Sequence, residues 1–107
     1  MAPLPIAIAF GRYDRTQALI EGRVRIQGCE STYFDLDLHQ IFFRTIRNKE
    51  FDISELSFSS YMAMAARGNA PYVAIPVFLS RMFRHSAIYV RRHLVDQGPT
   101  RLKGARV

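Results

Sequence analysis

The sequence predicts an α/β domain with a mainly parallel sheet flanked by helices, on two observations. Segments with the pattern of strands alternate along the chain with segments that have helical periodicity. The first strand, residues 6–10, is apolar at every position, which is typical of strands buried on both faces of a parallel sheet. The length of 107 residues is enough for one such domain.

A short helix is expected soon after the first strand. Gly11 closes the strand, Asp14 is the candidate N-cap, and Gly22 ends a helix over residues 15–21. Two stripes of apolar residues with helical spacing predict two longer helices further along the chain. Their apolar positions are Leu38, Ile41, Phe42 and Ile46 in a helix ending near Lys49, and Phe58, Tyr61, Met62, Ala65 and Ala66 in a helix ending at Gly68. The remaining extended segments are expected at residues 24–26, 32–36, 51–53, 73–79 and 86–90.

The net charge of +6 belongs to the C-terminal quarter of the chain. Residues 1–80 hold eight basic and eight acidic side chains, whereas the chain from Arg81 onward holds seven basic side chains against Asp96. A nucleic-acid-binding module would more often interleave basic and aromatic residues along one helix or sheet face, whereas arginine, at thirteen of the fifteen cations, is the default cation throughout this chain. We therefore expect no nucleic-acid partner.

The cysteine count and the N-terminus bear on cofactors and location. Cys29 is the single cysteine, so an internal disulfide is excluded, and neither a CxxC pair nor a His-rich cluster suggests zinc. Residues 1–10 lack the cationic start of a signal peptide, and no apolar run is long enough to cross a bilayer. A cytoplasmic protein that holds no metal or cofactor and binds no membrane is expected.

The loop GRYDR is the first candidate site, because open α/β sheets place their ligand groups after the carboxyl ends of strands. Tyr13 and Asp14 could face a ligand there. Equally, Asp14 could cap the helix and Tyr13 could pack as an ordinary aromatic side chain. Arg12 and Arg15 are expected to be solvated.

The second candidate site is SELSFSS, where several hydroxyls and one carboxylate crowd a helix start. Unpaired backbone N–H groups and the helix dipole favour anions at such a start, and the hydroxyls of Ser54, Ser57 and Ser59 would extend it toward a carboxylate. Ordinary capping, which needs one serine, is the alternative. Glu55 could serve there as a base or as a hydrogen-bond acceptor.

The third candidate site is the loop SRMFRHS, which holds two guanidiniums and an imidazole. Arg81 and Arg84 could clamp carboxylates, and His85 could exchange a proton near neutral pH. The set suits an acidic aromatic ligand, although a basic surface loop has the same composition. No nucleophile elbow and no glycine-rich phosphate loop is present in the sequence.

Five stretches spread along the chain share one resemblance. They are GRYDRTQAL, GRVRIQG, IFFRTIRNKEFDISELSFSSYMAMAARG, PYVAIPVFLSRMFRHSAIYVR and LKGARV. Read in order, they resemble the N-terminal part of the 4,5-dihydroxyphthalate decarboxylase family, essentially from end to end. Leu79 departs from the family, which tends to have proline before Ser-Arg, and this difference affects the rigidity of that loop more than its chemistry.

The resemblance implies a type 2 periplasmic-binding-protein-like fold, in which two α/β lobes enclose a cleft. Family chains are considerably longer than this one. The chain is then expected to hold an incomplete first lobe over residues 1–92, followed by a crossover segment and the start of a truncated second lobe over residues 93–107. The second lobe of its own full-length chain would be its partner.

The resemblance also implies a carboxy-lyase that converts 4,5-dihydroxyphthalate to 3,4-dihydroxybenzoate and carbon dioxide in bacterial phthalate degradation. The proton-transfer groups would be His85, Asp14 or Glu55. The groups that bind the small aromatic carboxylate would be Tyr13, Ser54, Ser57, Ser59, Arg81 and Arg84. A solute-binding protein of an ABC-type transporter, recognising a small organic anion, is the alternative, since fold and cleft would be the same.

Overall fold

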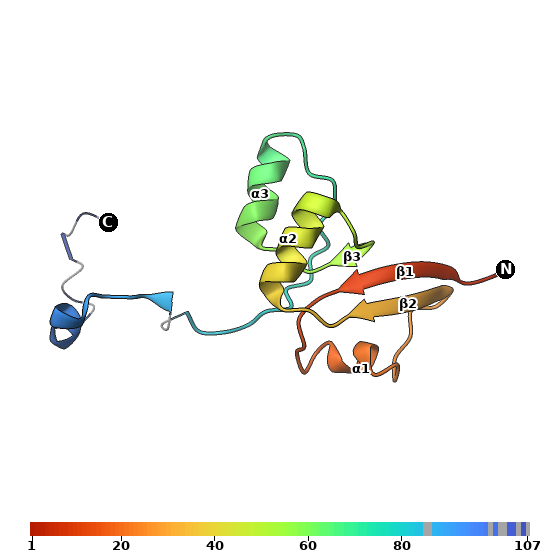
Figure 1. Ribbon diagram of the computed structural model, residues 1–107, viewed down its shortest axis with the longest axis horizontal. Helices are drawn as coiled ribbons and strands as arrows, with labels where there is room; N and C mark the ends of the chain where they lie inside the picture. Colours follow the sequence, from red (N-terminus) through yellow and green to blue (C-terminus); the bar gives the residue numbers. More distant parts are fainter. Residues whose placement is uncertain (85–86, 99, 101–102, 105, 107) are drawn as a thin grey trace.

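A parallel sheet of three strands forms the centre of the protein, as the computed structural model shows for residues 1–84, 87–98, 100, 103–104 and 106 (Figure 1). The strands are β1 (Leu4–Ala9), β2 (Cys29–Phe34) and β3 (Ile53–Ser54). Their order is β2-β1-β3, and both pairings are parallel, with Leu4 opposite Cys29 and Ile8 opposite Ile53. The predicted α/β architecture with a mainly parallel sheet is confirmed.

Strand β1 occupies the middle of the sheet because it is apolar on both faces. Its side chains point alternately to opposite faces. Ala9 belongs to a core cluster with Ile41 and Phe51, on one face, and Ile8 is buried at 1% exposure on the other. Helices lie on both sides of the sheet, so apolar side chains on both faces of β1 suit its position.

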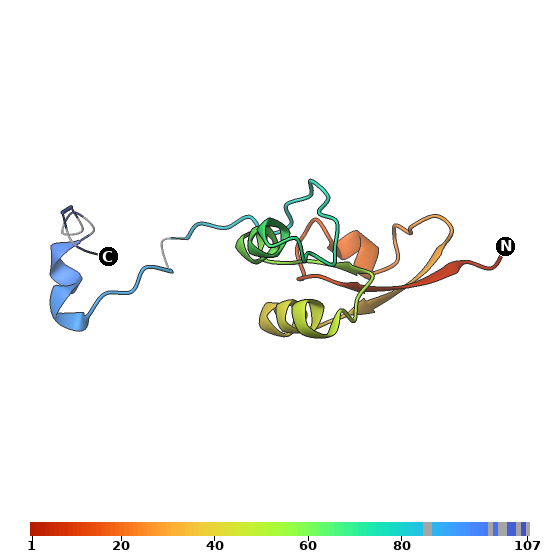
Figure 2. The same cartoon turned by 90° about the horizontal axis from the view of Figure 1, so that it is seen from above.

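Three helices flank the sheet, and Figure 2 shows α2 on one side of it and α1 and α3 on the other. Helix α2 (Leu38–Asn48) packs on the core with its buried residues Ile41 and Thr45. It begins at Asp37, whose side chain accepts from the N–H of Gln40 at 3.0 Å, and ends at Lys49 in the left-handed conformation. Helix α1 (Gln17–Ile20) is short, and α3 (Phe58–Ala66) starts after Ser57.

The predicted N-cap of the first helix is wrong. Helix α1 has Thr16 at its N-cap, and the carboxylate of Asp14 instead accepts from the N–H and the guanidinium of Arg15. The helix is also shorter than predicted, because Tyr13 to Thr16 form a tight turn before it begins.

Two segments that were predicted to be strands take local hydrogen bonds instead. Within residues 73–79 the Val77 N–H donates to the carbonyl of Ile75 across Pro76, whose ring nitrogen cannot donate to a sheet. Residues 24–26 turn back as well, since Val24 donates to Ala18 and Ile26 accepts from Cys29. Residues 87–90, the described part of the predicted strand 86–90, are not in a strand either.

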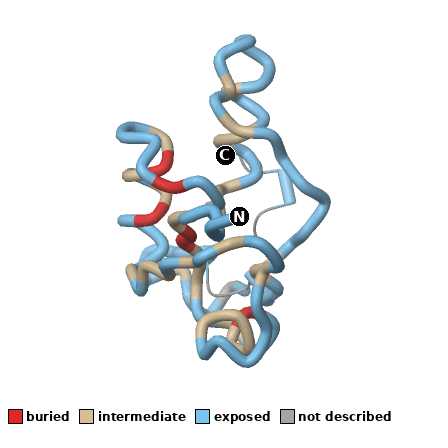
Figure 3. Tube along the Cα trace, turned by 90° about the vertical axis from the view of Figure 1, so that its right-hand side faces the viewer, coloured by how far each residue is buried: buried red, intermediate tan, exposed pale blue. Residues whose placement is uncertain are grey.

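The described residues after Ser80 lie away from the sheet and include the 3₁₀ helix η2 (Arg92–Gln97) (Figure 1). Of the residues whose burial the structure describes, six are buried, all within residues 8–51, and Figure 3 marks them in red. Among the residues that the structure describes, none of the helices is both long and apolar enough to span a bilayer. The sheet and its helices therefore carry the core, and the candidate site is built on them.

Candidate functional site

The carboxyl ends of the three parallel strands meet at one edge of the sheet, and polar residues follow each strand there. Residues 10–16 follow β1, residues 35–37 follow β2, and residues 55–57 follow β3. Ligands of open α/β sheets bind outside this edge. The segments GRYDR and SELSFSS, which lie far apart in sequence, are neighbours in the structure for this reason.

Glu55 joins two of these segments through its side chain. One carboxylate oxygen, Oε2, accepts from the N–H of Gly11 at 2.9 Å, and the other, Oε1, accepts from the hydroxyl of Tyr13 at 2.8 Å. The N–H of Glu55 also donates to the carbonyl of Ala9 at 2.8 Å, which extends the pairing of β1 with β3 by one residue. Both carboxylate oxygens are thus committed to the loop after β1, and the structure places Glu55 as a hydrogen-bond acceptor.

Tyr13 is a half-buried phenol whose proton is held by a carboxylate. Burial raises the pKa of Tyr13, and the hydrogen bond to Glu55 and the negative charge of that residue raise it further. Ser80 and Arg15 act in the opposite direction, and the guanidinium of Arg15 lies 5.5 Å from the centre of the Tyr13 ring. The phenol therefore keeps its proton at neutral pH and points it at Glu55.

Gly11 makes room for the Tyr13 ring. A Cβ atom built on Gly11 would lie 2.8–2.9 Å from three atoms of the Tyr13 side chain, which is closer than real Cβ contacts. A larger residue at this position would require the Tyr13 side chain to shift. The glycine therefore permits the close approach of Tyr13.

Arg12 and Asp35, which follow β1 and β2, form an ion pair at the same edge of the sheet. The Arg12 guanidinium donates to both oxygens of Asp35, at 3.0 Å from Nε and 2.8 Å from Nη2, and these hydrogen bonds lower the pKa of the Asp35 carboxyl. Arg12 is exposed, as expected, but it is also paired. Between this pair and Tyr13 lies an open cleft of about 470 Å³, lined by Gly11, Arg12, Tyr13, Asp35, Leu36, Asp37 and Leu38.

Sequence reasoning overlooked the contribution of β2 to this edge. Asp35 and Asp37 directly follow β2, so their position after a strand was a usable signal. It was missed because the extended segment was expected to reach residue 36, which would have put Asp35 inside the strand.

The serines at the end of β3 and after it fall into two groups. The Ser54 hydroxyl lies 2.6 Å from that of Thr45 and 2.9 Å from the carbonyl of Glu55, so it ties β3 to α2. The hydroxyls of Ser57 and Ser59 lie 3.0 Å from each other, and Ser57 makes no side-chain capping bond to α3. The capping alternative therefore does not describe Ser57 in this structure.

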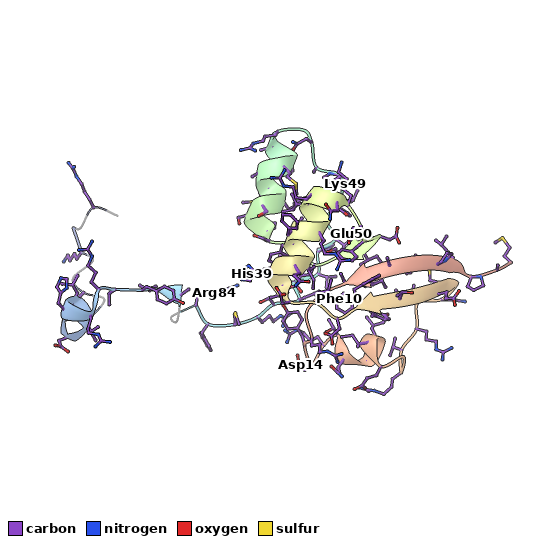
Figure 4. The ribbon with its side chains drawn as sticks, in the orientation of Figure 1. Phe10, Asp14, His39, Lys49, Glu50 and Arg84 are labelled. Atoms are coloured by element: carbon purple, nitrogen blue, oxygen red, sulfur yellow. The ribbon has the colours of Figure 1, made fainter. Side chains whose placement is uncertain are left out.

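Within the described part of the basic loop, Ser80 lies at Tyr13, where its hydrogen bond lowers the pKa of the phenol, but the two arginines lie apart from the Tyr13–Glu55 pair. Arg81 lines a second cavity, of about 450 Å³, together with mainly apolar residues such as Phe10, Ile53 and Phe78. Arg84 is exposed on the segment that leaves the sheet, and Figure 4 shows it well away from Asp14 and Phe10. His85 lies outside the described residues. The side chain of Asp14 is 83% exposed and pairs with Arg15.

Metal ligation has no candidate among the described residues, because no three His, Cys, Asp or Glu side chains gather there. What the fold and the site define is an α/β unit that carries polar and aromatic side chains at the carboxyl edge of a parallel sheet. This is the arrangement in which α/β proteins bind small molecules.

Comparison with known proteins shows which α/β proteins this chain is similar to. The chain is 47% identical over all 107 residues to a 4,5-dihydroxyphthalate decarboxylase of Comamonas testosteroni. It is 43% identical, again over 107 residues, to a 4,5-dihydroxyphthalate decarboxylase of Pseudomonas putida. The resemblance to the 4,5-dihydroxyphthalate decarboxylase family is thereby confirmed along the whole chain. The chain spans 32% of the length of the first relative and 42% of the second. No protein-family model matches the chain.

Proposed function

We propose that this chain forms one wall of the substrate site of a decarboxylase that acts on 4,5-dihydroxyphthalate. The observation that carries the proposal is the similarity to two decarboxylases so named, which runs over every residue of the chain. The polar edge of the sheet supports it, because this edge offers a cleft beside a phenol, a carboxylate and a guanidinium.

The proposed reaction exchanges a carboxylate for a proton on an aromatic ring. A donor protonates the ring carbon that bears the carboxylate, the bond to the carboxylate carbon breaks, and its electron pair restores the aromatic ring as carbon dioxide leaves. The two ring hydroxyls supply electron density for the protonation. The site must therefore contain a proton donor, an anchor for the carboxylates and groups that orient the hydroxyls.

Tyr13 and Glu55 are assigned to orientation in this proposal. The phenol proton of Tyr13 is engaged by Glu55 at 2.8 Å and Ser80 also bonds to the phenol oxygen, which leaves one lone pair to accept a further hydrogen bond. A ring hydroxyl of the substrate is a donor that fits this acceptor. Glu55, whose two oxygens already accept from Tyr13 and Gly11, holds the phenol in place and is not the base.

The other roles follow the chemistry of the remaining candidates. Asp14 and His85 are the proposed proton-transfer groups. Arg81 or Arg84, with Ser57 and Ser59 at the start of α3, are the proposed anchors for the carboxylates. The opposite wall is proposed to come from a second lobe of the type 2 periplasmic-binding-protein-like fold. Without that wall water is not excluded from the cleft, and the 107 residues alone are expected to release no measurable carbon dioxide.

A chimera tests the proposal. The matching stretch of the Comamonas testosteroni relative is replaced by residues 1–107 of this chain, and carbon dioxide release from 4,5-dihydroxyphthalate is measured. The relative itself is the positive control, and circular dichroism reports whether the chimera folds. Turnover by the chimera supports the proposal. A folded chimera without turnover contradicts it.

The same experiment distinguishes a decarboxylase from the alternative, a solute-binding protein. If the folded chimera binds 4,5-dihydroxyphthalate but releases no carbon dioxide, this chain lacks groups for the reaction that the relative supplies in its own matching stretch. That result would favour a solute-binding protein.

A further inference from the structure

We propose that Thr16 is a positioning residue, whose hydroxyl fixes the loop after β1 so that the Tyr13 phenol meets Glu55. Thr16 touches neither carboxylate nor phenol oxygen directly. It acts through the backbone of Gly11 and Tyr13, the two residues that contact Glu55. Its relevance to catalysis rests on the function proposed above, but its effect on Tyr13 does not.

The hydroxyl of Thr16 bridges both ends of the tripeptide from Gly11 to Tyr13. Its oxygen accepts from the N–H of Tyr13 at 2.9 Å. It lies 3.0 Å from the carbonyl of Gly11 and 3.1 Å from that of Tyr13, and it has one proton to donate. The Tyr13 carbonyl already accepts the N–H groups of Thr16 and Gln17, so we assign the proton to Gly11.

This bridge explains the contacts of Tyr13 with Glu55. Closing the tripeptide brings the Tyr13 ring over the α-carbon of Gly11, where the absence of a side chain leaves space for it. In that position the Tyr13 hydroxyl and the Gly11 N–H both point at the carboxylate of Glu55, at 2.8 Å and 2.9 Å. Thr16 does not share in these contacts, so its influence passes through the backbone.

Burial makes the bridge costly to break. Thr16 is 2% exposed, so water has no access to replace its hydroxyl. Its loss leaves the Gly11 carbonyl and the Tyr13 N–H without their partner in a water-poor region, and the loop has to rearrange to satisfy them. A rearranged loop carries the Tyr13 ring with it.

The chain provides a matched control. Thr45 is also a buried threonine, at 1% exposure, and its hydroxyl contacts the carbonyl of Ile41 and the hydroxyl of Ser54, both at 2.6 Å. It lies on α2, outside the Tyr13 loop, and its partner Ser54 contacts the backbone carbonyl of Glu55 but not the Glu55 carboxylate. Thr16→Val and Thr45→Val thus remove the same group from equally buried sites. Thr16→Ser keeps the hydroxyl and loses a methyl group.

The test measures the pKa of Tyr13 in this chain by NMR of ring-labelled tyrosine. We expect Thr16→Val to lower the Tyr13 pKa toward that of an exposed tyrosine, while Thr16→Ser and Thr45→Val leave it raised. An unchanged pKa in Thr16→Val, or an equal decrease in Thr45→Val, overturns the proposal. Neither result depends on decarboxylation.

A wild-type measurement covers the case in which Thr16→Val does not fold. The Tyr13 N–H is expected to exchange with solvent more slowly than an unpaired amide, because it donates to the buried Thr16 oxygen. Exchange at the rate of an unpaired amide would overturn the proposal. In the chimera, if the proposed function holds, Thr16→Val should lower kcat/KM by about tenfold, and Thr16→Ser should restore most of it.

Discussion

Replacing Gly11 with alanine is expected to separate Tyr13 from Glu55. The new Cβ atom would lie 2.8 Å from Cζ of Tyr13, whereas ordinary contact begins at 3.4 Å, so the ring must withdraw by about 0.6 Å. The atoms met by the new Cβ lie at the phenol end of the ring, so a shift of this size is expected to weaken the 2.8 Å hydrogen bond to Glu55. The Tyr13 pKa should therefore decrease.

The stability change in the same variant is small, because two effects oppose each other. A hydrogen bond to a charged group contributes about 1.5–3 kcal/mol, and the half-buried position of this pair puts it at the lower end. Alanine also restricts the unfolded chain, which stabilises the fold by about 0.4–1 kcal/mol. The net loss is then about 0.5–1 kcal/mol, so the Tyr13 pKa is the sharper measurement.

The assay is an NMR pH titration of ring-labelled tyrosine, in which Tyr13→Phe assigns the signal among the five tyrosines of the chain. Gly22→Ala is the control. Gly22 has a φ of 71° and nothing within 4 Å of a built Cβ, so alanine there strains the backbone without touching the site. A Gly11→Ala variant that keeps the raised Tyr13 pKa would refute the argument from close approach.

Three further predictions concern stability, each measured by urea denaturation. Since the pKa of Tyr13 is raised by folding, its contribution is present below about pH 10 and is lost as the pH rises through the folded-state pKa, so Tyr13→Phe should lose less stability in alkali. An equal loss would contradict this. Ile41→Ala should cost about 2–5 kcal/mol, because the side chain is fully buried, whereas Phe43→Ala, at 60% exposure, should change stability by less than about 0.5 kcal/mol. Asp37→Ala should cost about 1 kcal/mol through loss of the α2 cap, and Asp37→Asn should retain most of it. Equal effects in either pair would contradict the assigned contacts.

The sequence was informative where a pattern is local. An unbroken apolar run made β1 recognisable as a central strand, and the spacing of Leu38, Ile41 and Ile46 located α2 to within one residue of its observed end. The strand at residues 73–79 was mispredicted because an apolar run does not reveal whether a sheet partner is available. Here the Val77 N–H donates to the carbonyl of Ile75 in a local turn, and Pro76 has no N–H to donate to a sheet.

The site could be predicted only in part. The rule that ligand groups follow the carboxyl end of a strand singled out Tyr13 and Asp14, and the polar helix start SELSFSS singled out Glu55. The contact between Tyr13 and Glu55 joins residues 42 positions apart, so no spacing rule could supply it. The contacts of Thr16 could not be predicted either. A threonine before a short helix is ordinarily a cap, whereas here its hydroxyl bonds to the backbone of Gly11 and Tyr13 in the preceding loop.

The most direct test of the central claim is the turnover of Tyr13→Phe in the chimera with the Comamonas testosteroni relative. Tyr89→Phe, at a residue 90% exposed and outside the sheet, is the control. If the phenol oxygen accepts from a substrate hydroxyl, its removal should lower kcat/KM for 4,5-dihydroxyphthalate by about tenfold or more, while the control keeps wild-type turnover. Wild-type turnover in Tyr13→Phe would contradict the assignment of this edge of the sheet as a wall of the substrate site.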